Sequence, residues 1–80
     1  MLKPHSLLEQ ARDIHGDPTL HTVYDYEMEA WTVCGRIYVT TSFPTERAAL
    51  ACAVVDAHQI GCPCVVCDWY YNKHIDGDET

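Results

Sequence analysis

The chain has 80 residues, of which 12 are acidic and 5 are lysine or arginine, so its formal net charge is −7. This surplus of carboxylates disfavours direct binding to a nucleic-acid backbone, which requires lysine and arginine. No apolar run approaches the ~20 residues that cross a bilayer, and the first ten residues lack the apolar core of a secretory signal. We therefore expect one cytoplasmic domain over residues 1–80 that binds neither nucleic acid nor membrane and whose partner is a protein with a basic surface.

Residues 1–17 predict a short helix followed by a turn. The apolar residues between Leu7 and Ile14 share one helical face, and the charged residues lie largely opposite. Gly16 favours the end of the helix, and the Asp-Pro pair that follows is typical of a turn. About nine residues are too few for a helix that is stable alone in water. This helix must therefore dock on the rest of the chain.

The segment from Leu20 to Phe43 alternates polar and apolar residues with a period of two, which is typical of strands with one buried face. Cys34-Gly35 is the most favourable site for a hairpin turn, because Gly35 can take a positive φ. The second strand then covers residues 36–42. In this register the face that packs on the main helix carries Tyr26, Met28, Ala30, Ile37 and Val39, and it can extend to Phe43.

Residues 45–61, TERAALACAVVDAHQIG, predict the main helix, around which the rest of the chain packs. Thr45 is a suitable N-cap, Gly61 can end the helix, and Pro63 prevents it from resuming. The middle of this helix is apolar on all sides, and such a helix must be covered on more than one side. The second cover is the N-terminal helix, a second copy of the chain, or a partner.

Residues 64–71, CVVCDWYY, predict a third strand, and residues 72–80 predict an acidic tail. The expected fold is therefore α+β. A short N-terminal helix precedes a ββαβ core over residues 20–71, in which a small antiparallel sheet packs on one main helix.

An acidic row on the first strand is the candidate contact surface. Its carboxylates recur every second residue and would meet lysines and arginines of a partner. Two aromatic residues lie beside the row, and aromatic side chains are frequent anchors of interfaces. The predicted partner-binding residues are Asp25, Glu27, Glu29, Trp31 and Tyr38. The alternative interpretation is a solvated strand face, with the aromatic residues covered by the N-terminal helix.

The five cysteines are an odd number in a chain without an export signal, which favours free thiols or a metal site over disulfides. His58, Cys62, Cys64 and Cys67 are ligand types that zinc prefers. Their spacing differs from that of the common zinc fingers, and a regular strand would direct Cys64 and Cys67 to opposite faces. We therefore expect no cofactor, and we keep a zinc site as the alternative. A redox role for the C-x-x-C pair is disfavoured, because working pairs open a helix and a strand is expected here.

No phosphate-binding loop, paired metal-binding carboxylates or family spacing of nucleophile and base is present. The sequence thus predicts a non-enzyme that acts as a protein-binding module. A small zinc-stabilised domain and a structural homodimer are the alternatives.

The segment EAWTVCGRIYVTTSFPTERAALACAVVDAHQIGCPCVVCDW resembles small ββαβ proteins of phages and bacteria, among them anti-CRISPR proteins. The shared features are a tryptophan in the hairpin, F-x-T at the helix start, alanines along the helix, a glycine at its end and a closing strand. The resemblance covers about half of the chain and assigns no residue roles. It implies an inhibitor that acts in the host cytoplasm and occludes a basic surface of a nucleic-acid-handling complex, such as a CRISPR effector complex.

Overall fold

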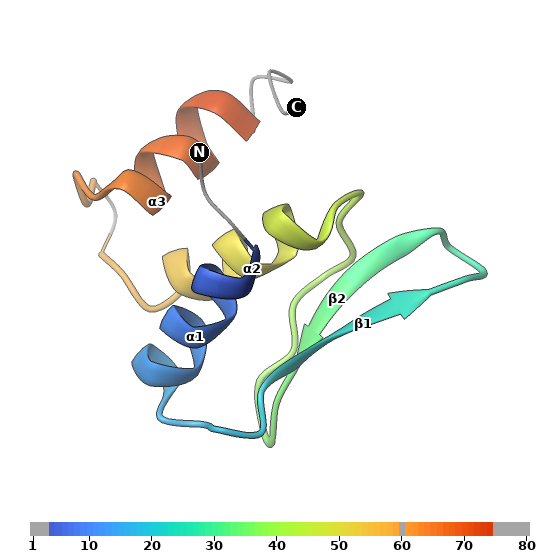
Figure 1. Ribbon diagram of the computed structural model, residues 1–80. Helices are drawn as coiled ribbons and strands as arrows, with labels where there is room; N and C mark the ends of the chain where they lie inside the picture. The colour runs from blue at the N-terminus through green and yellow to red at the C-terminus, as the bar shows by residue number, and fades with distance from the viewer. Residues whose placement is uncertain (1–3, 60, 75–80) are drawn as a thin grey trace.

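A computed structural model describes residues 4–59 and 61–74 (Figure 1). In chain order the elements are α1 (Pro4–His15), β1 (His21–Asp25), β2 (Ala30–Cys34), α2 (Glu46–Val55), α3 (Val65–Asp68) and the π-helical turn η1 (Trp69–His74). The α+β class is confirmed. Within the described ranges, no helix combines the length and the apolar character needed to cross a membrane.

Helix α2 lies at the centre of the molecule, and α1, both strands, α3 and η1 all contact it (Figure 1). Its N-cap is Thr45, as predicted, whose Oγ1 accepts the N–H of Ala48 at 3.1 Å. The helix ends at Val55, earlier than the sequence suggested. Its buried residues surround the helix axis, which confirms the expected cover on several sides. They are Ala48, Ala49, Leu50, Ala51, Ala53, Val54 and Val55.

Helix α1 provides one of these covers. Leu7 and Ala11 are buried at its contact with α2. At the end of α1, the ring of His15 donates to the carbonyl of Ala53, with 2.7 Å between Nε2 and O. The N-terminal helix therefore docks on the main helix, as its short length requires.

The predicted third strand is wrong, because the chain is helical from Val65 to His74. β-branched and aromatic residues favoured a strand there. However, Val66, Cys67 and Tyr70 lie at a spacing that places them on one helical face, and they pack into the core. The sheet therefore has no closing strand, and the ββαβ core predicted over residues 20–71 ends in a helix. The predicted acidic tail begins with residues 72–74 in η1, and its remainder lies outside the described residues.

The hairpin also differs from the prediction. β1 pairs antiparallel with β2 across a turn at residues 26–29, with Asp25 opposite Ala30. The carboxylate of Asp25 accepts the N–H groups of Glu27 at 2.9 Å and Met28 at 3.3 Å. Such side-chain hydrogen bonds stabilise turns, and this one divides the long strand that was expected.

A second reversal does occur near the predicted Cys34-Gly35 turn. The N–H of Gly35 donates to the carbonyl of Tyr38 at 2.7 Å, and the following chain runs back along β2. Isolated bridges join Cys34 to Val39 and Trp31 to Phe43, in place of the regular strand that was predicted over residues 36–42.

The extra turn reverses which side chains are buried. Of the five residues expected to face the main helix, only Ala30 is buried, and the other four are exposed (Tyr26, Met28, Ile37 and Val39). Phe43, to which this face could extend, is partly buried and packs against the core. Val33, expected on the opposite face, is fully buried instead. A shift of register by one residue exchanges the two faces of a strand, so an unrecognised turn is enough to cause this error.

Asp17 joins the end of α1 to the chain that follows β2. Its carboxylate accepts the N–H of Arg36 at 2.7 Å, and both the N–H and the hydroxyl of Thr19. These hydrogen bonds, led by that from Arg36, hold the pKa of Asp17 at about 2. A Cβ atom at Gly35 would lie only 2.6 Å from Asp17 Oδ2, so the loops can approach this closely only at a glycine.

We expect Asp17→Asn to lower the melting temperature at pH 7, because an amide group cannot accept all three hydrogen bonds. The folded-state pKa lies below the ordinary value of 3.8, so the ionised carboxylate stabilises the fold above that value. This contribution is lost as the pH falls from 3.8 to about 2, and the two proteins should then converge. Thermal unfolding followed by circular dichroism at pH 7 and pH ~2 tests this. Equal melting temperatures at pH 7 would contradict it, and Asp13→Asn provides the exposed control.

Candidate metal centre

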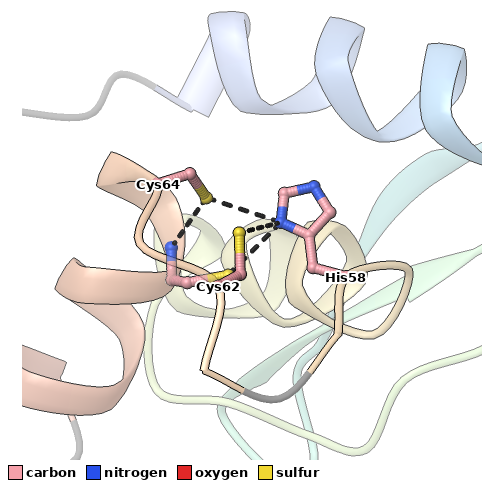
Figure 2. A group of neighbouring side chains, drawn as sticks. His58, Cys62 and Cys64 are labelled. Carbon is pink, nitrogen blue, oxygen red and sulfur yellow. Dashed lines mark hydrogen bonds between the residues drawn. The ribbon is translucent and has the colours of Figure 1, made fainter.

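Three cysteines and one histidine gather between the end of α2 and the start of α3. His58 and Cys62 lie in the connecting loop, Cys64 is the N-cap of α3, and Cys67 is the third residue of that helix. The side chains of His58, Cys62 and Cys64 point toward one another (Figure 2). Together with Cys67, their potential ligand atoms all lie within 4.8 Å of one another.

The nitrogen–sulfur distances fit a tetrahedral metal site. The Nδ1 atom of His58 lies 3.3 Å from the sulfur of Cys67, 3.4 Å from that of Cys64 and 3.6 Å from that of Cys62. In a tetrahedron with zinc–sulfur bonds of ~2.3 Å and zinc–nitrogen bonds of ~2.0 Å, nitrogen and sulfur are about 3.5 Å apart. One imidazole nitrogen has a single donor or acceptor position, so hydrogen bonding does not account for three thiols around it.

The local backbone explains how the loop reaches this arrangement. The N–H of His58 donates to the carbonyl of Val55 at 2.9 Å, which fixes the histidine at the end of α2. Gly61 then takes a φ of 87°, and the N–H of Cys62 donates back to the carbonyl of Gln59 at 3.1 Å. This tight turn returns the chain toward His58.

The helical start of α3 brings the last two thiols together. Cys64 Sγ accepts the N–H of Cys67 at 3.4 Å, as an N-cap side chain does. Residues three apart are neighbours on a helix, whereas on a strand they face opposite ways. The predicted strand was therefore, together with the unusual ligand spacing, the reason why these four residues were not expected to converge.

The thiols influence one another's ionisation. Burial raises the pKa of Cys64, but hydrogen bonds from Cys67, Cys62 and His58 outweigh it and bring the pKa to about 7. Burial and the neighbouring thiols raise the pKa of Cys67 to about 12. Without a metal, Cys64 ionises more readily than an ordinary thiol, and its negative charge opposes ionisation of Cys67. A bound dication removes this repulsion, because a metal deprotonates the thiols that coordinate it.

The cluster offers four potential protein ligands, which is the number in closed structural zinc sites. Catalytic zinc sites keep one position for water or substrate. The arrangement therefore fits a metal that holds α3 and the loop on the end of α2.

The C-x-x-C pair does open a helix, so the positional argument against a redox role was wrong. A redox pair uses two cysteines, however, and it leaves the approach of His58 and Cys62 unexplained. A metal ion at this cluster would have all four side chains as ligands.

The five residues predicted to bind a partner do not share one strand face. Asp25, Glu27 and Glu29 lie in or beside the β1–β2 turn. Trp31 is half-buried and packs edge-on against Tyr24, with 5.1 Å between ring centroids.

Tyr38 lies at the other end of β2, where it is held by both long helices. Its ring stacks on His15 with 4.3 Å between centroids, and its hydroxyl donates to the carboxylate of Asp56. Burial, followed by this hydrogen bond, raises the pKa of Tyr38. Tyr38 and Trp31 thus contribute to the packing of the hairpin, and the acidic residues lie apart from Tyr38.

Comparisons of the chain with models of protein families, with curated proteins and with solved structures found no match. The geometry of the cluster and the surfaces around it are therefore the features of this chain that indicate a function.

Cobalt(II) binding tests the centre directly, because cobalt replaces zinc in tetrahedral thiolate sites and gives a visible absorption spectrum. We expect a one-to-one complex with the wild-type chain. Cys62→Ser and Cys67→Ser should weaken binding by more than the ~10–100-fold that loss of an outer-shell partner costs.

Cys34→Ser is the matched control, because Cys34 is a half-buried free cysteine in β2, outside the cluster. It should bind cobalt as the wild type does. Equal binding by Cys34→Ser and Cys67→Ser would contradict the assignment.

Proposed function

We propose that this chain is a small zinc-stabilised domain. The observation that carries the proposal is the approach of three thiols to Nδ1 of His58, at 3.3, 3.4 and 3.6 Å. Soft thiolate ligands in a tetrahedral arrangement favour zinc among the metals generally available to proteins. Four protein ligands make the role of this zinc structural.

The C-terminal part of the chain has the greatest need of such a metal. α3 has 4 residues, and its buried side chains are Val66 and Cys67. A domain of 80 residues also has a thin core. Zinc binding by small domains contributes about 10–16 kcal/mol of apparent free energy, much of which becomes folding free energy. We infer that zinc holds α3 and η1 against α2.

Chelation should therefore unfold the C-terminal helix first. We expect a strong zinc chelator to lower the melting temperature and to speed amide hydrogen exchange in residues 61–74 more than in α1. Native mass spectrometry should show one zinc per chain before chelation. Identical melting and exchange with and without chelator would contradict a structural zinc. A dimeric mass would support the homodimer alternative.

We further propose that the domain is a cytoplasmic, non-catalytic protein-binding module. Free thiols and thiolate metal sites suit a reducing compartment. The net charge of −7 favours a partner with a basic surface. The specific form that the resemblance suggests is an inhibitor that covers the basic surface of a nucleic-acid-handling complex, such as a CRISPR effector complex.

The β1–β2 turn supports this second proposal. Tyr26 is 84% exposed and Met28 is 64% exposed, directly between the acidic side chains of Asp25, Glu27 and Glu29. Exposed aromatic and methionine side chains are enriched at protein interfaces. The turn thus combines apolar contact area with negative charge in five consecutive residues.

Reversing charge at this turn should abolish partner binding. In a pull-down from bacterial lysate, we expect the wild-type chain to retain basic proteins. The double variant Glu27→Lys/Glu29→Lys should not retain them, and its melting temperature should be unchanged. Asp25 is left unchanged because its carboxylate caps the turn. The matched control is Glu9→Lys/Asp13→Lys on α1, which alters the net charge equally. Equal retention by the two double variants would count against the turn as the contact surface.

A further inference from the structure

A hollow of about 610 Å³ lies beside the metal centre, between the loop at residues 61–63 and the helix formed by α3 and η1. Pro63 and the cysteines form part of its largely apolar wall, and Asp68, Tyr71 and Asn72 line its helical side. The hollow has room for a long side chain and one charged group at its rim.

Asp68 presents this charge to solvent. Its Oδ1 accepts from Nδ2 of Asn72 at 2.9 Å, which orients the carboxylate. Among the side chains that the structure describes, no basic group pairs with Asp68. Its second oxygen accepts no hydrogen bond from the described side chains, and in the proposal below it is the acceptor for a ligand.

Tyr71 and Asn72, which also line the hollow, lie in the π-helical turn η1. Segments of π-helix are rare and occur frequently at functional sites. Tyr71 in this turn is 49% exposed, and its ring is held edge-on against Tyr70 with 5.2 Å between centroids. An exposed and fixed aromatic ring can pack against methylene groups or against a cation.

We propose that this hollow binds a lysine side chain of a partner protein. The methylene groups lie against Pro63 and Tyr71, and the ammonium group contacts Asp68. This inference rests on the proposed zinc centre, whose three thiolates and one dication add a net negative charge beside Asp68. Lysine fits better than arginine because Asn72 already engages one carboxylate oxygen, which hinders bidentate pairing with a guanidinium group.

Charge also selects this occupant over the chain's own end. Residues 75–80 carry three carboxylates and no basic side chain. Both Asp68 and the thiolate centre would repel them. A lysine from a basic partner surface is attracted by the same groups.

The probe for the test is Nα-acetyl-lysine methylamide, added to the zinc-loaded full chain while backbone amide signals are followed by NMR. We expect saturable shifts at Asp68, Tyr71 and Asn72. The Nε-acetylated form of the probe, which lacks the charge, should leave these signals unchanged. Asp68→Asn should weaken binding about fivefold, as expected for an exposed ion pair. Asp13→Asn removes a carboxylate on α1 and should have no effect.

Saturable shifts of equal size with both forms of the probe would overturn the inference, as would unchanged affinity in Asp68→Asn. Shifts at these amides that depend on protein concentration without probe would assign the hollow to a second copy of the chain. A zinc-loaded protein that ignores the probe would overturn this inference alone. A folded chain that binds no zinc would overturn the proposed function together with it.

Discussion

The small side chains of α2 allow the other elements of this protein to approach one helix from several directions. Ala48, Ala49, Ala51 and Ala53 have no exposed surface, so neighbouring chain lies directly against each of them. Close packing of this kind leaves little room for larger side chains, because protein interiors have few voids. Every covering element is short, and its position depends on this contact.

The C-terminal end of α2 links the parts that lie around it. Asp56 is the C-cap residue and accepts the hydroxyl of Tyr38, which ties the hairpin to the helix end. Two residues later, His58 reaches the cysteines of the loop and of α3. A change at this helix end would therefore affect the hairpin and the proposed zinc centre together. Neighbouring residues that share partners in this way are expected to give non-additive effects on stability.

The two proposed contact surfaces lie on different sides of α2, one at the β1–β2 turn and the other beside α3 (Figure 1). Both carry negative charge, in keeping with the net charge of −7. A basic partner could engage either surface without disturbing the buried residues of α2. The zinc centre would support the second surface, because it fixes the loop that forms one wall of the hollow.

The sequence by itself determined the acidic character of the protein, the α+β class, the N-cap at Thr45 and the need to cover α2 on several sides. These features depend on composition, on local capping and on one long apolar segment. The four candidate metal ligands could also be identified from the sequence by their residue types. Their local pattern, a Pro-Cys-x-x-Cys run with Val66 and Tyr70 four residues apart, was a signal for a helix that the β-branched residues outweighed.

Only the tertiary structure decided that Cys64 and Cys67 face the same way and that the hairpin turns at residues 26–29. Both outcomes depend on interactions that periodicity does not report. Burial of Val66 against α2 selects helix over strand, and hydrogen bonds from two backbone N–H groups to Asp25 select a turn within an alternating segment. Short apolar runs fit helix and strand equally well, so packing against the rest of the chain makes the choice.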